Sequence, residues 1–163
     1  MKASLFILPV LLLGELQLPP PQTGSASSTP VVTGAFFAIS VPEIAASTRW
    51  YSENLGLRVT MEVPRTSLQP AVTVLEGRGL IVELIQNDNA VPVATAAPAI
   101  RDPNLFHGLL KAGFIVEDFD ATVALFRKNK VDITFGPYPS RSNQRANVIV
   151  KDNAGNLIQV LGK

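Results

Sequence analysis

Apolar residues along this chain fall into short runs, some with the spacing of a strand and others with that of a helix. The first run, at 34–41, is β-prone and predicts a strand. Pro42 and Glu43 then suit a first helical turn. Apolar residues recur at helical spacing over 44–55, and Gly56 favours a helix end. Three further strands are predicted at 57–63, 71–75 and 80–85.

The same order of elements recurs further along the chain. The segment 39–51 reappears as 114–126, so that Val41 is matched by Val116 at an offset of 75 residues (116 − 41 = 75). A helix capped by Asp118 is expected after the matching strand. The strands of this copy are predicted at 109–116, 131–135, 146–150 and 156–161. The duplication predicts two like modules about a pseudo-two-fold axis, with any site where equivalent positions converge.

These patterns divide the chain into four parts. Residues 34–86 form the first β-α-β-β-β module, and residues 108–162 form the second. Residues 87–107 join them and contain several prolines and many alanines, which is typical of a linker. Its role is either that of a spacer or that of a lid over a central cavity.

Residues 1–30 have the pattern of a signal peptide followed by a disordered linker. A basic start at Lys2 precedes an apolar stretch at 5–13, and a Pro/Gly/Ser-rich segment follows, with cleavage expected after Ala26 or Ser28. The apolar stretch is too short to span a membrane. We therefore expect an exported protein, periplasmic or extracellular. The alternative is a disordered cytosolic N-terminus.

The composition of the chain limits which partners and which kinds of catalytic or metal site are possible. The chain has 163 residues, 47% apolar and 17% charged, enough for one globular core, and its net charge of +1 argues against a nucleic-acid partner. It has no cysteine, which excludes disulfides, thiolate catalysis and cysteine-based metal sites. The sole histidine, His107, leaves little for a catalytic triad or a multi-histidine metal site.

Three stretches carry a family resemblance, and together they cover almost all of residues 34–162. They are 36–43 with 50–57, then 113–118, then 151–159. In this order they resemble the vicinal oxygen chelate proteins, the superfamily of glyoxalase I, bleomycin-resistance proteins and extradiol dioxygenases. The resemblance implies an α+β fold of two tandem βαβββ modules whose mixed sheet forms a cup.

In the metal-dependent members of that superfamily, four inward-facing side chains bind one divalent cation on the cup floor. The resemblance places these positions at Phe36, Glu83, Lys111 and Gln159, which pair through the repeat (111 − 36 = 75; 159 − 83 = 76). Phe36 has no donor atom and a charged Lys111 repels a cation. Gln159 offers only a neutral oxygen, so Glu83 is the one strong ligand. We therefore expect neither a bound metal nor another cofactor.

Two interpretations of the altered cup floor stay open. Lys111 and Glu83 form an ion pair that closes the floor, or Lys111 stands where the cation stood and attracts an anionic ligand. His107 lies four residues before Lys111, and a shift of the alignment brings it into the cup instead.

The leading functional prediction is a small-molecule-binding domain like the bleomycin-resistance branch, with ligand contacts from Phe36, Glu83, Lys111, Gln159 and Tyr138. One alternative is a lyase or isomerase of the same superfamily that uses Glu83 as general base. Another is a protein–protein interaction module. No membrane span is expected, and a homodimer is left open.

Overall fold

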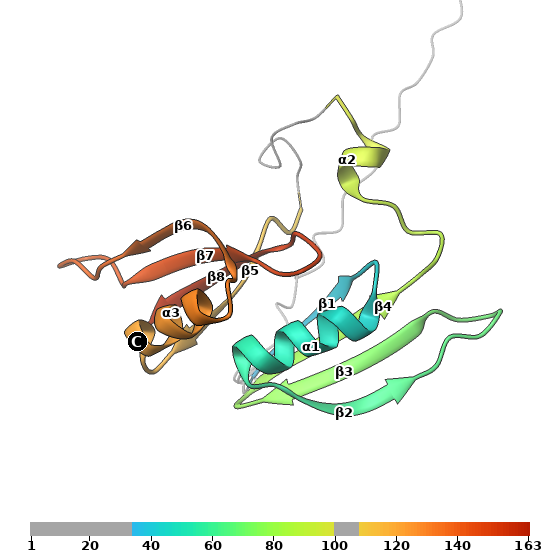
Figure 1. Cartoon of the computed structure of the whole chain (residues 1–163), viewed down its shortest axis with the longest axis horizontal. Helices are drawn as coiled ribbons and strands as arrows, with labels where there is room; N and C mark the ends of the chain where they lie inside the picture. The colour runs from blue at the N-terminus through green and yellow to red at the C-terminus, as the bar shows by residue number, and fades with distance from the viewer. Residues whose placement is uncertain (1–33, 100–107) are drawn as a thin grey trace, which may run out of the picture. The chain divides into compact units, whose positions relative to one another are not determined.

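The computed structural model describes residues 34–99 and 108–163. In these ranges a strand and a helix are followed by three consecutive strands, and this order occurs twice (Figure 1). In chain order the elements are β1 (Ala35–Ser40), α1 (Ile44–Leu55), β2 (Arg58–Val63), β3 (Ala71–Gly77), β4 (Leu80–Gln86), α2 (Val93–Ala96), β5 (Ala112–Val116), α3 (Phe119–Lys128), β6 (Asp132–Tyr138), β7 (Asn147–Lys151) and β8 (Leu157–Gly162).

The strands form two four-stranded mixed sheets with the same topology. The first has the order β1-β4-β3-β2, and the second has the order β5-β8-β7-β6. In each sheet the first strand runs parallel to the last strand of its module, and the other neighbours are antiparallel. The α+β class and the tandem βαβββ arrangement predicted from the sequence are confirmed.

Both ends of helix α1 are capped by hydrogen bonds that involve backbone N–H groups. The Glu43 carboxylate accepts hydrogen bonds from the N–H groups of Ala45 and Ala46, so Glu43 is the N-cap. At the other end Gly56 adopts φ 66° and donates its N–H to the Ser52 carbonyl. The expected stop at Gly56 is confirmed. Pro42 and Glu43, expected in the first turn, instead precede the helix, because an extended Glu43 is needed for capping.

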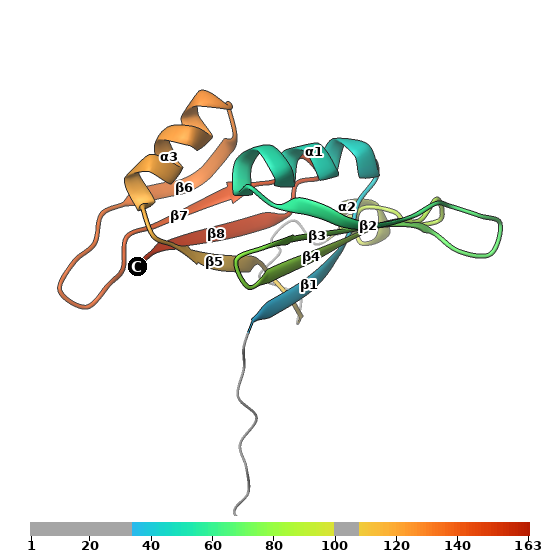
Figure 2. The ribbon, with the colours of Figure 1, turned by 90° about the horizontal axis from the view of Figure 1, so that it is seen from below.

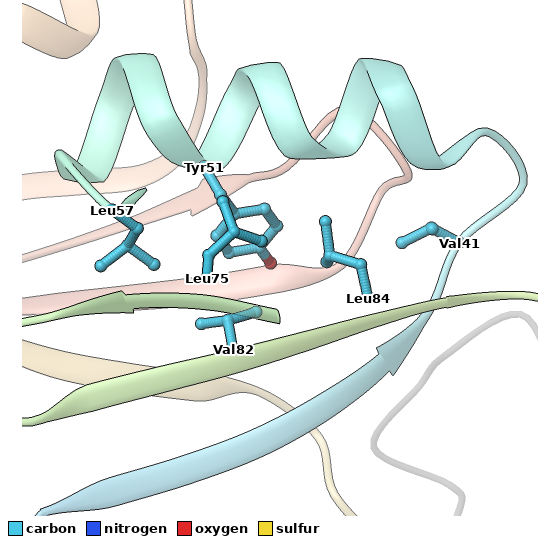
Figure 3. Close-up of a cluster of buried hydrophobic side chains, with 6 residues drawn as sticks. All are labelled: Val41, Tyr51, Leu57, Leu75, Val82 and Leu84. Atoms are coloured by element: carbon cyan, nitrogen blue, oxygen red, sulfur yellow. The ribbon is translucent and has the colours of Figure 1, made fainter. Parts of the chain in front are cut away.

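The first core lies between α1 and its sheet, as Figure 3 shows. Tyr51 and Leu57 meet Leu75, Val82 and Leu84 there, and Val41 closes one end. Since side chains alternate along a strand, the residues on either side of Val82 and Leu84 face away from the helix. One face of this sheet is therefore covered by α1 and the other is not (Figure 2).

The second core repeats this arrangement under α3. It consists of apolar side chains from the helix and the two central strands: Val123, Phe126, Val148, Val150, Ile158 and Val160. Trp50 and Leu55 of α1 pack against both cores. Phe37 of β1 also stacks on Phe114 of β5, with ring centroids 6.4 Å apart. The two modules thus share apolar contacts, although no strand pairing joins their sheets in the described ranges.

Strand β5 is shorter than the sequence predicted. It begins at Ala112, and Leu109 to Lys111 lie ahead of it. Its partner among the described strands, β8, starts at Leu157 directly after a turn closed by the Asp152 N–H and the Asn156 carbonyl. No neighbouring strand is therefore available to Leu109 and Leu110, which expose 79% and 40% of their surface.

The predicted linker contains one short helix, α2, within its described residues. The expected signal peptide at 1–30 and His107 lie outside the described ranges. Within those ranges, no helix has the length and apolar character needed to cross a membrane.

Candidate functional site

Each sheet has one face turned away from its helix, called here the helix-free face. In the first sheet it carries Phe36, Ala38 and Glu83, because Val82 and Leu84 point to α1. In the second sheet it carries Gly113 and Gln159, because Ile158 and Val160 point to α3. Glu83 lies beside Ala38, and Gln159 beside Gly113 (113 − 38 = 75). The register therefore makes Glu83 and Gln159 pseudo-symmetric equivalents.

Phe36 and Glu83 share a face but differ in environment. Phe36 lies opposite Ile81 and is 62% exposed. Glu83 is half-buried between Ala38 and Val74, and its carboxylate has no hydrogen bond or ion pair within the described residues. A half-buried carboxylate among small and apolar neighbours is available for chemistry or for contact with a ligand.

Lys111 and Gln159 belong to the second sheet. Gln159 is half-buried between Gly113 and Ile149, and Lys111 is exposed just before β5. The proposed Lys111–Glu83 ion pair does not form: the ion pairs of the described ranges are Arg65–Asp88, Lys151–Asp132 and Lys163–Glu117. The structure therefore separates the two groups that the sequence suggested would neutralise each other.

Tyr138 lies at the end of β6, opposite Asn147, and is 51% exposed. It lines neither the cavity at the start of β8 nor the cavity at the start of β4. The structure therefore does not bring Tyr138 together with the other predicted contact residues.

The residues at the superfamily's metal positions do not suit a divalent cation. Phe36 has no lone pair to donate and a Lys111 ammonium has none when charged. Within the described ranges, no group of three or more His, Asp or Glu side chains could hold a metal ion. One carboxylate and one amide, at Glu83 and Gln159, fall short of the oxygen ligand set that hard cations need.

A large cavity lies where β8 begins, and we call it the β8 cavity. Its volume is about 670 Å³, within the range of small-molecule sites. Its walls are mainly apolar and include Leu109, Leu110, Ala112, Phe135, Leu157 and Ile158. Val93 of α2 adds a wall from the linker. Of the predicted site residues, Lys111 lines this cavity.

Thr134 and Lys151 also line the β8 cavity, and sequence reasoning missed both. Lys151 is the repeat equivalent of Glu76 (151 − 76 = 75), a change of charge that was visible in the sequence. The role of Thr134 depends on a bulge in β6 between Ile133 and Phe135, which no local pattern reveals.

A buried hydrogen-bond network fixes the turn that forms one wall of this cavity. The Tyr51 hydroxyl donates to the Asp152 carboxylate at 3.0 Å, and that carboxylate also accepts from the N–H groups of Ala154 and Asn156. Burial, and then the neighbouring Asp152 charge, raise the pKa of the Tyr51 phenol above its ordinary value. The phenol therefore stays a donor and ties the turn at Asn156 to α1.

Comparison with known proteins identifies the family. The family model of the Glyoxalase/Bleomycin resistance protein/Dioxygenase superfamily matches residues 35–160. The chain belongs to this superfamily. A search of curated proteins finds no match.

Solved structures with glyoxalase folds agree. A glyoxalase family protein from Enterococcus faecalis shares 16% identity, covering 80% of this chain and 96% of its own, at a TM-score of 0.62. The trypanothione-dependent glyoxalase I of Leishmania major shares 21% identity, with coverages of 82% and 87% and a TM-score of 0.59. TnmS3, an antibiotic binding protein from Streptomyces sp. CB03234, shares 18% identity, with coverages of 83% and 97% and a TM-score of 0.55. At these identities the likeness concerns the fold.

Proposed function

We propose that this chain binds a small molecule in the β8 cavity and does so without a metal ion. The observation that carries the proposal is the cavity itself, about 670 Å³ with mainly apolar walls and a few polar groups. TnmS3, a protein of similar fold, is an antibiotic binding protein, which supports binding as a function that this fold can serve. The donor-poor positions of Phe36 and Lys111 favour the metal-free form.

Binding is tested with N-phenyl-1-naphthylamine, a neutral apolar dye that fluoresces when it leaves water. The expected result is saturable binding of one dye per chain. Leu157→Trp narrows the cavity and should abolish that binding, whereas Leu125→Trp, on α3 and outside the cavity, should leave it unchanged. Equal binding by both variants would place the dye elsewhere and refute the proposed site.

The metal-free form is tested by elemental analysis of the purified protein. We expect far less than one nickel, zinc, iron or manganese ion per chain. A stoichiometric metal that survives dialysis would overturn this part of the proposal.

Glu83 supports a second candidate function, that of a lyase or isomerase. Its half-buried carboxylate has no partner within the described residues, so it is available as a general base. Turnover of the methylglyoxal–thiol adduct that is lost in Glu83→Gln and retained in Glu62→Gln, an exposed glutamate of β2, would establish this activity.

We further propose that the protein is exported, on the pattern of residues 1–30. N-terminal sequencing of the protein recovered from its source should begin after Ala26 or Ser28. An intact Met1 on the recovered protein would exclude cleavage.

A further inference from the structure

The β8 cavity has a counterpart in the first module, at the start of β4, which we call the β4 cavity. Its volume is about 510 Å³, and its walls include Phe36, Thr60, Glu76 and Ile81. These residues are the repeat equivalents of Lys111, Thr134, Lys151 and Leu157, all of which line the β8 cavity. The offsets are 74 to 76 residues (134 − 60 = 74; 157 − 81 = 76).

The strand pairing confirms that these threonines are equivalent. Thr60 lies at a register shift between Val59 and Met61, and Thr134 at the corresponding shift between Ile133 and Phe135. Each threonine therefore occupies the bulged position of its strand. The duplicated fold thus places one threonine in the wall of each cavity.

The hydroxyls of Thr60 and Thr134 differ in their hydrogen bonding. The Thr60 hydroxyl has two acceptors in reach, the Glu76 carboxylate at 3.2 Å and the Val74 carbonyl at 3.4 Å. In the second module Lys151 takes the place of Glu76, and a lysine ammonium is a donor that cannot accept. Thr134 Oγ1 is buried with no hydrogen-bond partner within the described residues. A buried hydroxyl without a partner costs stability unless a ligand satisfies it.

The replacement also changes the charge of the cavity. Lys111 and Lys151 line the β8 cavity, and among the described residues no carboxylate does. The carboxylate nearest to Lys151, that of Asp132, lies 3.9 Å from its Nζ, and the Asp132 side chain is 64% exposed. The β4 cavity instead holds Glu76 with two arginines, Arg58 and Arg78. Only the second module therefore combines apolar walls, two ammonium groups and a hydroxyl free to donate.

We propose that the β8 cavity selects amphipathic anions: compact apolar or aromatic molecules that carry one carboxylate, sulfonate or phosphate group. The apolar body packs against the Leu109 and Leu157 walls, and the anionic oxygens accept from Lys111, Lys151 and Thr134. The β4 cavity has a weaker preference, because Glu76 offsets part of the charge of Arg58 and Arg78 and accepts the hydrogen bond of the Thr60 hydroxyl. This inference rests on the proposed binding function and adds the class of ligand.

Two dyes with the same aromatic skeleton test the charge preference on the full-length chain. 8-Anilinonaphthalene-1-sulfonate carries an anionic group that N-phenyl-1-naphthylamine lacks. We expect the sulfonate to bind about tenfold more tightly, the contribution of charge-assisted hydrogen bonds. Lys151→Met and Lys111→Met should each weaken binding of the sulfonate by about three- to tenfold and leave binding of the neutral dye unchanged.

Three further variants test whether the loss of sulfonate binding depends on the position of the charge, on the net charge of the protein or on unfolding. Arg58→Met removes a cation from the β4 cavity and should have no effect on the sulfonate. Lys151→Glu recreates the Thr60–Glu76 arrangement and should abolish sulfonate binding but retain neutral-dye binding. Thr134→Val should weaken binding of the sulfonate. It should also raise the unfolding temperature of the unliganded protein, since it removes an unsatisfied buried hydroxyl.

The outcomes test the anion preference and the binding function separately. Equal affinities for the two dyes, unaltered by the lysine variants, would overturn the anion preference and leave the binding function standing. An equal loss in Arg58→Met and Lys151→Met would also overturn it, because the effect would then be one of net charge. Absence of binding by both dyes would refute the binding function and this inference with it.

Discussion

Tyr51 lies in the first module, but its hydrogen-bond partner belongs to the second. The phenol is fully buried against Leu75 and Leu84, and its hydroxyl donates to Asp152 at 3.0 Å. The Asp152 carboxylate is itself buried and also caps its own turn. One side chain therefore serves as a core residue of one module and as a polar anchor for the other.

Removing that hydroxyl should destabilise the protein. Tyr51→Phe leaves the buried Asp152 carboxylate with one acceptor site unsatisfied, and we expect a loss of about 1–3 kcal/mol of unfolding free energy. Urea denaturation followed by circular dichroism measures the loss. Tyr138→Phe, at a tyrosine that is 51% exposed, is the control and should change stability by less than about 0.5 kcal/mol. Similar losses in the two variants would contradict the anchoring role.

The same phenol makes the free energy of unfolding depend on pH in the alkaline range. Burial and the Asp152 charge raise the pKa of Tyr51 above its ordinary value, so the folded state keeps a proton that the unfolded chain releases. This contribution is complete below about pH 10 and falls as the pH rises, by up to about 1.4 kcal/mol per pH unit. The difference in unfolding free energy between the wild type and Tyr51→Phe should therefore begin to shrink above about pH 10, by about 1.4 kcal/mol at pH 11. Parallel curves would show that the phenol does not titrate in this way.

At the scale of elements, the sequence predicted helix ends better than strand ends. Asp118 caps α3 as expected, accepting from the Ala121 N–H at 2.8 Å, because capping depends on residues a few positions apart. Gly56 likewise ends α1. Strand bounds depend on a partner that is distant in sequence, so β5 proved shorter and the bulges at Thr60 and Thr134 were not anticipated.

The cap of α3 offers a local test. Asp118→Ala leaves an N–H of the first turn without its acceptor and should cost about 1 kcal/mol, whereas Asp118→Asn should restore most of it. Thermal unfolding measures both. Asp120→Ala, in the same first turn but without a capping bond, is the matched control and should cost clearly less. A larger effect at Asp120 would show that charge at the helix end matters more than the cap.

At the scale of the whole described domain, the two modules meet about the axis that the repeat implies. Asn129 Nδ2 donates to Asn54 Oδ1 at 2.9 Å, and these residues are repeat equivalents (129 − 54 = 75). Residues that contact their own equivalents must lie close to a two-fold axis. Asn153 also donates to Ser47 across the same boundary. Trp50 packs against both cores there.

This shared boundary predicts that the modules unfold together. Trp50 is the sole tryptophan, so its fluorescence reports the boundary, and far-ultraviolet circular dichroism reports the helices and sheets of both modules. The two urea transitions should coincide at one midpoint. An earlier loss of the Trp50 signal, with secondary structure retained, would show that the modules separate before they unfold.

The sequence by itself determined the architecture of this protein, because two copies of one strand and helix pattern leave few ways to bury their apolar faces. It also located equivalent positions at Phe36, Glu83, Lys111 and Gln159 and showed that their side chains do not suit a metal. These conclusions depend on periodicity, repeat spacing and the chemistry of single residues, all of which can be seen along the chain.

Only the tertiary structure decided which side chains share a cavity. It separated Lys111 from Glu83 and placed Lys111 with Lys151 and Thr134, at the start of β8. Strand register, the two bulges and the end of β5 set that grouping, and each results from pairing between segments distant in sequence. The repeat predicts one site where equivalent positions converge, whereas the structure has a cavity in each module. Among the described residues Thr134 Oγ1 has no hydrogen-bond partner, while Thr60 donates to Glu76.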